Sequence, residues 1–241
     1  MNPFSLEGRT ALVTGANTGI GQAIAVAMAQ AGAEVIAAAR RDCDETLALM
    51  GSGRALRLDF ADPMAARDLF ASERIDILVN NAGIIRRAEA VDFTEADWDA
   101  VMDVNMKALF FTCQAFARAA LPRGAGKIVN IASLLSFQGG IRVPSYTASK
   151  HGVAGLTKLM ANEWAARGLN VNAIAPGYIE TNNTSALRAD PDRSKAILDR
   201  IPAGRWGKPE DIAQTAVFLS APASGYVNGA VLNVDGGWLA R

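Results

Sequence analysis

A tyrosine and a lysine four residues apart, Tyr146 and Lys150, are well suited to acid–base chemistry. If the segment is helical, residues at this spacing share one face, so the phenol and the ammonium point into the same space. A cation about 4 Å from the phenol would lower its pKa from ~10 towards neutrality. The pair is therefore predicted to exchange a proton with a substrate near neutral pH. Ser133 lies thirteen residues upstream of Tyr146.

A glycine-bearing turn near the N-terminus fits a phosphate site. The apolar run Thr10–Val13 predicts a strand, Gln22–Ala31 predicts a helix, and Gly15, Gly19 and Gly21 lie between them. Glycines let the backbone turn tightly and a pyrophosphate approach, while the helix N-terminus offers free amides and partial positive charge. No Gly-Lys-Ser/Thr sequence follows, which argues against a nucleotide-hydrolysing P-loop.

Apolar runs alternate with helical patterns along the whole chain, and their continuous apolar character suits strands covered on both faces. We predict a single α/β domain over residues 1–241, a doubly wound parallel sheet of about seven strands with helices on both faces. The predicted strands are Thr10–Val13, Glu34–Ala38, Ala55–Leu58, Ile75–Val79, Lys127–Ile131, Leu169–Ile174 and Val231–Val234. The later predicted helices are Asp62–Ser72, Glu95–Leu121, Ser145–Ala166 and Pro209–Leu219.

Composition limits the partners. The 24 basic and 24 acidic residues cancel, so no basic excess is available for nucleic acid or an anionic membrane, and neither partner is expected. Cys43 and Cys113 lack metal-ligand spacing, so we expect reduced thiols and no metal site. The N-terminus lacks a signal pattern, and no uncharged stretch reaches the ~20 apolar residues of a membrane span, so a cytoplasmic location is expected.

Together, these motifs resemble the short-chain dehydrogenase/reductase family over essentially the whole chain. The matching residues are Thr14-Gly15-x-x-x-Gly19-Ile20-Gly21, Asn80-Asn81-Ala82-Gly83, Asn105, Ser133, Tyr146, Lys150 and Pro176-Gly177. The resemblance implies a Rossmann-like fold, an NAD(P)-dependent oxidoreductase that acts on CH–OH groups, and a homotetramer paired through the long helices. The apolar C-terminus, Trp238–Arg241, is expected to pack on a neighbouring subunit, and His151 is read as a packing or interface residue.

Further segments are similar to the branch of the family that acts on deoxy sugar acids of the 2-deoxy-D-gluconate or 2-dehydro-3-deoxy-D-gluconate type, in uronate breakdown. These segments are 136–146, 160–164, 182–184, 200–207 and 234–241. A 3-oxoacyl-thioester reductase of the same family is the alternative enzyme, and it would need a basic surface for an acidic carrier protein. A regulatory nucleotide-binding protein without catalysis is the alternative from another class, but Tyr146 and Lys150 are both present.

The resemblance also implies roles for individual residues. Tyr146 would be the acid and Ser133 the fixed hydrogen-bond donor at the ketone oxygen, where negative charge develops as hydride arrives. Lys150 would lower the Tyr146 pKa and bind the nicotinamide ribose, and Asn105 would hold a water that links Lys150 to solvent. The remaining cofactor contacts would be Gly15, Asn17, Thr18, Gly19, Ile20, Gly21, Asp59, Phe60, Asn81, Ala82, Gly83, Pro176, Gly177, Ile179 and Thr181.

The choice between NAD and NADP stays open. The second strand ends at Ala39 and is followed by Arg40 and Arg41, so no carboxylate is placed to bind a ribose 2′-hydroxyl. The two guanidiniums could bind a 2′-phosphate, which favours NADP. The related deoxy sugar acid enzymes are associated mainly with NAD, so both cofactors are expected candidates.

A sugar acid needs a cation for its carboxylate and neutral donors for its hydroxyls. Arg142 is the first candidate for the carboxylate, ahead of Arg86 and Arg87, although these arginines could instead make surface or subunit contacts. The candidate hydroxyl contacts are Gln138, Asn182, Asn183 and Trp206. The polar segment 178–202 follows Pro176-Gly177 at a strand end, and we predict that it forms a substrate lid.

Overall fold

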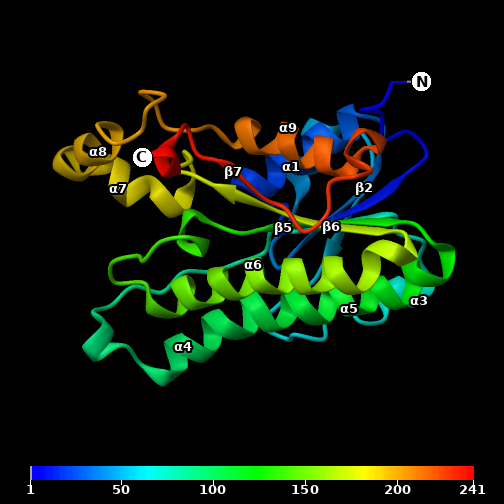
Figure 1. Ribbon diagram of the computed structural model, residues 1–241, viewed down its shortest axis with the longest axis horizontal. Coiled ribbons are helices and arrows are strands. Elements are labelled where there is room, and N and C mark those ends of the chain that lie inside the picture. The colour runs from blue at the N-terminus through cyan, green and yellow to red at the C-terminus, as the bar shows by residue number, and fades with distance from the viewer. Residues whose placement is uncertain (1) are drawn as a thin grey trace.

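The computed structural model describes residues 2–241 and confirms the predicted doubly wound fold (Figure 1). Within these residues, seven parallel strands form one sheet in the order β3-β2-β1-β4-β5-β6-β7. The strands are β1 (Thr10–Thr14), β2 (Glu34–Ala39), β3 (Arg54–Arg57), β4 (Ile77–Asn80), β5 (Gly126–Ile131), β6 (Leu169–Pro176) and β7 (Val231–Val234). In the centre of the sheet, Leu12 of β1 is level with Ile36 of β2 and Leu78 of β4.

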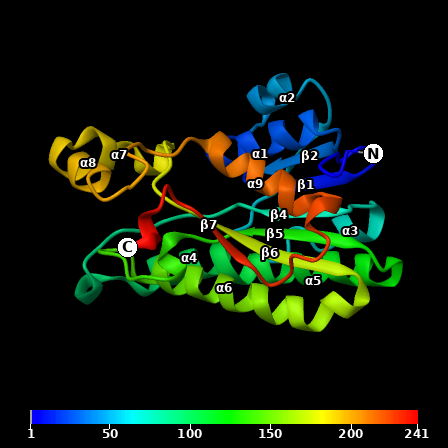
Figure 2. The ribbon, with the colours of Figure 1, turned by 45° about the horizontal axis from the view of Figure 1, so that its top comes forward.

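Helices cover both faces of this sheet (Figures 1 and 2). They are α1 (Gly19–Gln30), α2 (Asp44–Met50), α3 (Leu69–Ser72), α4 (Glu95–Met102), α5 (Ala108–Ala120), α6 (Pro144–Trp164), α7 (Ser185–Ala189), α8 (Pro191–Leu198) and α9 (Pro209–Ser220). Successive strand side chains point to opposite faces. Ala11 and Val13 therefore pack with α1 and α9, whereas Leu12 packs with α5 and α6, and both layers are buried. No helix in residues 2–241 combines the length and apolarity needed to cross a membrane.

The strand order creates a crevice between β1 and β4. The chain runs outwards from β1 to β2 and β3, then returns to β4 on the other side of β1. Connections at the carboxyl ends of β1 and β4 therefore diverge, and ligands of open α/β sheets bind at such a switch point. The glycine turn follows β1 at this edge, and the Asn81-Ala82-Gly83 segment follows β4.

Two predicted helices differ in the structure. Only Leu69–Ser72 of the predicted Asp62–Ser72 helix is α-helical, because the Asp59 and Asp62 carboxylates accept the backbone N–H groups of Ala61 and Met64 and favour turns instead. The predicted Glu95–Leu121 helix is interrupted by a π-helical turn at Asp103–Lys107. The structure also contains helices that the sequence patterns do not predict: α2, and α7 and α8 within segment 178–202. Helices α7 and α8 lie together at one end of the molecule (Figure 1).

Candidate active site

The glycine turn leaves room for an anionic ligand. Gly15 and Gly19 have φ values of 64° and 59°, a region that favours glycine. A Cβ atom on Gly21 would overlap the carbonyl oxygen of Gly15 and the side-chain amide of Asn81. Thr18 precedes α1, and its side chain does not cap the helix, so the first amides of α1 stay available to a phosphate.

Hydrogen bonds fix this turn to the segment after β4. The buried Thr14 hydroxyl accepts the backbone N–H groups of Asn81 and Ala82, each at 3.0 Å. The Asn81 side-chain amide donates to the carbonyls of Thr14 at 3.0 Å and Gly15 at 3.1 Å. The two sides of the crevice are therefore joined without using the amides of the α1 N-terminus.

Two adjoining cavities contain most of the predicted cofactor residues. A cavity of about 480 Å³ is lined by residues that include Gly15, Asn17, Arg40, Arg41, Asp59, Phe60, Ala82 and Gly83. A cavity of about 250 Å³ is lined by residues that include Asn17, Thr18, Gly19, Ile20, Gly21, Asn81, Thr181 and Asn182. The two cavities share several lining residues and lie beside the glycine turn and the arginines. Together they fit an extended dinucleotide with a phosphate at the glycine turn. Ile84 and Val104 also line the larger cavity, although their apolar side chains gave no signal in the sequence.

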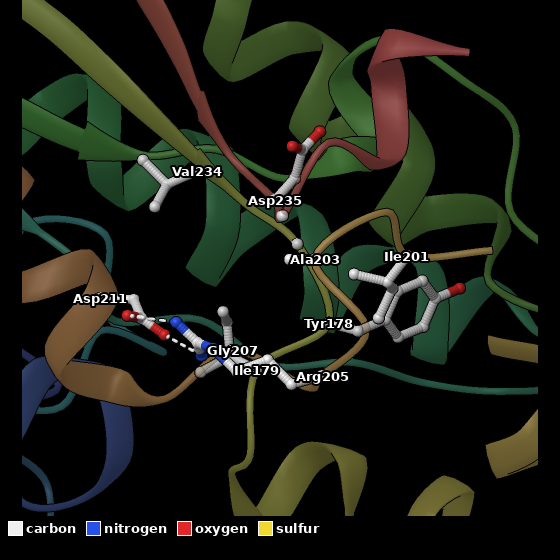
Figure 3. Close-up of a pocket in the computed structure, with 11 residues that line it drawn as sticks. Tyr178, Ile179, Ile201, Ala203, Arg205, Gly207, Asp211, Val234 and Asp235 are labelled. Carbon is white, nitrogen blue, oxygen red and sulfur yellow. Dashed lines mark hydrogen bonds and ion pairs between the residues drawn. The ribbon is translucent and has the colours of Figure 1, made fainter. Parts of the chain in front are cut away.

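Pro176, Gly177 and Ile179 lie further along the crevice, at the end of β6. Gly177 and Ile179 line a separate cavity of about 200 Å³ (Figure 3). Figure 3 shows the Arg205 guanidinium directed at the Asp211 carboxylate on the wall of this cavity, where the two groups are 2.7 Å apart. Tyr146, Lys150 and Ser133 are not among its lining residues, so this cavity does not contain the predicted reaction centre.

The N-terminal half of α6 positions the predicted acid and its neighbour. Pro144 occupies the first turn of α6, where its missing N–H costs nothing. Tyr146 and Lys150 follow one turn apart, and the Lys150 Nζ atom lies 5.5 Å from the centroid of the Tyr146 ring. The Lys150 ammonium is buried and donates to the Ile131 carbonyl at 2.6 Å, at the end of β5. The helix thus brings the two side chains together beside the carboxyl edge of the sheet.

Burial shifts the pKa of both groups. Burial lowers the pKa of Lys150 to about 8. Burial also raises the pKa of Tyr146, while a hydrogen bond with Ser133 and the charge of Arg87 act in the opposite direction. The prediction that Lys150 lowers the Tyr146 pKa towards neutrality is therefore wrong in this structure, because desolvation of the phenol outweighs the groups that lower its pKa. The structure instead assigns lowering effects to Ser133 and Arg87.

Asn105 lies in the π-helical turn between α4 and α5. Its side-chain oxygen accepts the Ile84 backbone N–H at 2.8 Å, and its amide donates to the Ile84 carbonyl at 2.9 Å. The same amide lies 3.4 Å from the Ser149 hydroxyl in α6. The Asn105 side chain therefore connects the segment after β4 to the π-helical turn and to α6. Its predicted role in holding a water stays a prediction.

The predicted substrate residues occupy different places. Arg142 pairs with Glu89 at 3.2 Å on the surface, and Arg86 pairs with Asp97 at 3.1 Å beside the larger cofactor cavity. Arg87 donates to the Asn183 carbonyl at 3.3 Å. Of these three arginines, Arg87 is the one whose charge acts on Tyr146.

Aromatic packing engages two other predicted substrate residues. Gln138 accepts the Trp238 indole N–H at 3.2 Å, and Trp206 is 7% exposed. Tyr178 packs between Trp206 and Trp238, at centroid distances of 5.5 and 4.7 Å. Trp238 is therefore buried within its own chain, and the expectation that it packs on a neighbouring subunit is wrong for this residue. For the exposed Ala240 and Arg241 the expectation stays a prediction. His151 is exposed, with Nδ1 3.0 Å from the Thr147 carbonyl oxygen.

Comparison with known proteins agrees with this geometry. A family model described as enoyl-(acyl carrier protein) reductase, of the short-chain alcohol dehydrogenase type, matches residues 15–239. The chain belongs to the short-chain dehydrogenase/reductase family. It is an NAD(P)-dependent oxidoreductase, as the family assignment and the combination of cofactor crevice, Tyr146 and Lys150 indicate.

Individual relatives are similar over their whole length. The chain is 58% identical to the 2-dehydro-3-deoxy-D-gluconate 5-dehydrogenase of Bacillus subtilis, with 99% of this chain and 97% of the relative covered. It is 54% identical to the enzyme of the same name from Dickeya dadantii, with 100% and 99% covered. A crystal structure of a putative 2-deoxy-D-gluconate 3-dehydrogenase from Agrobacterium tumefaciens with bound NADP is 73% identical, with a TM-score of 0.99 and all of both chains covered.

Proposed function

We propose that this protein transfers hydride between a nicotinamide cofactor and a hydroxyl or keto group of a deoxy sugar acid, of the 2-deoxy-D-gluconate or 2-dehydro-3-deoxy-D-gluconate type. The observation that carries the proposal is the placement of Tyr146 and Lys150, one helical turn apart, at the crevice beside the glycine turn. The names of full-length relatives at 54% and 58% identity support this substrate class.

The chain's own residues handle the proton. When bound, the nicotinamide supplies or accepts the hydride. With its pKa raised by burial, Tyr146 carries its proton at neutral pH, the form needed to protonate a ketone oxygen. Ser133, which hydrogen-bonds with Tyr146, would donate a second hydrogen bond to that oxygen. In the oxidative direction the deprotonated form of Tyr146, which becomes populated as the pH rises, would accept the proton of the substrate hydroxyl, and Lys150 would hold the nicotinamide ribose.

A substrate panel tests this proposal. Initial rates are measured with 2-dehydro-3-deoxy-D-gluconate, 2-deoxy-D-gluconate and an acetoacetyl thioester, each with both nicotinamide cofactors. We expect kcat/KM to be highest for one of the sugar acids. A higher value for the thioester would replace the proposal with the 3-oxoacyl-thioester reductase. No turnover with any substrate, together with tight cofactor binding, would favour the regulatory protein.

We also propose a preference for NADP. Arg40 and Arg41 line the cavity that would hold the adenosine half, and the residue before them is Ala39. A charge-assisted hydrogen bond contributes about 1.5–3 kcal/mol. We therefore expect Arg40→Ala combined with Arg41→Ala to lower kcat/KM for NADP by roughly tenfold or more, with little effect on NAD. Arg67→Ala, which changes an exposed arginine outside this cavity, is the matched control. Equal losses for both cofactors would contradict the preference.

Arg87 is our proposed contact for the substrate carboxylate, in place of Arg142. Its guanidinium donates to the Asn183 carbonyl in the lid segment, and its charge acts to lower the pKa of Tyr146. A carboxylate a few carbons from the reacting oxygen would therefore meet Arg87 before Arg142 or Arg86, which are paired with Glu89 and Asp97. Asn182 lines the adjoining cavity and is the candidate hydroxyl contact.

We further propose a single domain with segment 178–202 as its lid, a homotetramer and a cytoplasmic location. The lid is supported by its position across the crevice, where Arg87 contacts Asn183. The tetramer is supported by exposed apolar side chains on the outer helices, with Trp98 of α4 39% exposed and Leu159 of α6 46% exposed. Light scattering on Leu159→Glu tests this assembly. Wild type is expected as a tetramer that the variant splits, and a wild-type monomer would contradict it.

A further inference from the structure

Arg142 has an unusual backbone conformation. It is the one non-glycine residue among residues 2–241 with φ in the left-handed region, at 63°. Such a conformation costs free energy for any residue with a Cβ, and it persists where the surroundings enforce it. Arg142 lies in the loop between Ser133 and Tyr146. The contacts that enforce its left-handed conformation therefore also fix the connection between two residues of the reaction centre.

Two contacts join Arg142 to the segment that follows β4. Its carbonyl accepts the Ala88 backbone N–H at 3.1 Å, and its Nε atom lies 3.2 Å from a carboxylate oxygen of Glu89. Backbone and side chain therefore hold adjacent residues of the same segment. Arg87 immediately precedes this pair, so the segment is fixed directly beside the guanidinium that reaches the lid.

Arg87 is consequently held from two directions. Its guanidinium donates to the Asn183 carbonyl on the lid side, and the residues that follow it are held by Arg142 on the α6 side. The side chains of Arg142 and Arg86 are each engaged in an ion pair with a carboxylate. Arg87, in contrast, has only a backbone carbonyl as its hydrogen-bond partner in the described chain. Arg87 thus retains donors for an incoming anion, because a guanidinium carries five N–H groups.

We propose that Arg142 is a positioning residue, which holds the 87–89 segment so that the Arg87 guanidinium is pre-oriented for the carboxylate of the substrate. The inference rests on the proposed role of Arg87 and deepens it. The left-handed backbone of Arg142 is retained because it directs the carbonyl to Ala88 while the side chain reaches Glu89. Specificity for an acid over an uncharged analogue then depends on a residue that does not touch the substrate.

Substitutions at the two ends of the ion pair test this role. Arg142→Gly accommodates the left-handed backbone and removes the side chain, so we expect a higher unfolding temperature. Glu89→Gln breaks the ion pair without relieving the backbone. Both variants are expected to raise KM for the sugar acid by about threefold to fivefold, the size that an exposed ion pair supports, and to leave kcat nearly unchanged.

The control substrate is the amide of the same sugar acid, for which KM should be unchanged in both variants. In an Arg87→Gln background, Arg142→Gly should raise KM for the acid no further, because the two residues act on one contact. If Arg87→Gln raises KM and Arg142→Gly does not, Arg142 has no positioning role. An equal loss for acid and amide would also overturn it. If Arg87→Gln leaves KM for the acid unchanged, the proposed carboxylate contact itself fails.

Discussion

Replacing Lys150 with methionine should change how the stability of the protein depends on pH. Lys150 is 5% exposed, and burial lowers its pKa from 10.5 to about 8. That difference corresponds to roughly 3 kcal/mol by which the folded protein disfavours the charged lysine relative to the unfolded chain. Methionine fills similar space and carries no charge, so this cost is absent in Lys150→Met.

The sign follows from proton binding. Between pH 8 and pH 10.5 the unfolded chain retains the lysine proton that the folded protein has released. Stability rises with pH wherever the unfolded state binds more protons, so the Lys150 contribution is most unfavourable below about pH 8 and disappears towards pH 10.5. Relative to Lys150→Met, wild type should gain about 2 kcal/mol between about pH 7.5 and pH 9.5.

Urea denaturation of both proteins across this pH range measures the effect. Other titrating groups are common to both, so the difference between the two free energies of unfolding isolates Lys150. The carbonyl of Ile131, which loses its partner in the variant, adds an offset that does not depend on pH. Both proteins are compared at one protein concentration, because assembly shifts apparent stability. A difference that stays constant from pH 7.5 to pH 9.5 would refute the reasoning about burial of Lys150.

Other residues give further expectations. Thr14→Val leaves the N–H groups of Asn81 and Ala82 without their acceptor, so the free energy of unfolding should fall by about 2–4 kcal/mol. Thr14→Ser should stay near wild type, and equal values for the two variants would exclude the hydroxyl as the cause. Gly21→Ala places a Cβ against the Gly15 carbonyl, so cofactor titration should show at least tenfold weaker binding, and unchanged binding would mean that the turn is not the phosphate site. Cys43 and Cys113 are buried, and their pKa values are raised, to about 12 for Cys113. A thiol reagent at pH 8 should therefore react rapidly only after unfolding, and fast reaction of the native protein would contradict their burial.

The fold and the reaction centre were accessible from sequence because their signals are local. Apolar runs of strand length, a glycine turn and a four-residue spacing each depend on a few neighbouring positions. Tyr146 and Lys150 needed only a helix to meet. The doubly wound sheet and the cofactor crevice follow from the same alternation of elements.

Features set by tertiary contacts were not accessible in this way. The π-helical turn at Asn105 is accompanied by hydrogen bonds to Ile84, a residue distant in sequence. The pKa of Tyr146 depends on burial, which outweighs the nearby charges that spacing suggests. Sequence order also could not rank Arg87 above Arg142, because their partners Asn183 and Glu89 come from loops that meet only in the folded chain.

The most direct test of the account is the turnover of Tyr146→Phe with the preferred sugar acid and cofactor. The substitution removes one hydroxyl, and Tyr226→Phe, at a fully exposed tyrosine, is the matched control. We expect kcat to fall by roughly 10²-fold or more in Tyr146→Phe while cofactor affinity stays close to wild type, because a positioned acid–base group contributes ~10²–10⁴-fold. Turnover within a few-fold of wild type, with the cofactor bound, would contradict the claim that the Tyr146 hydroxyl moves the proton.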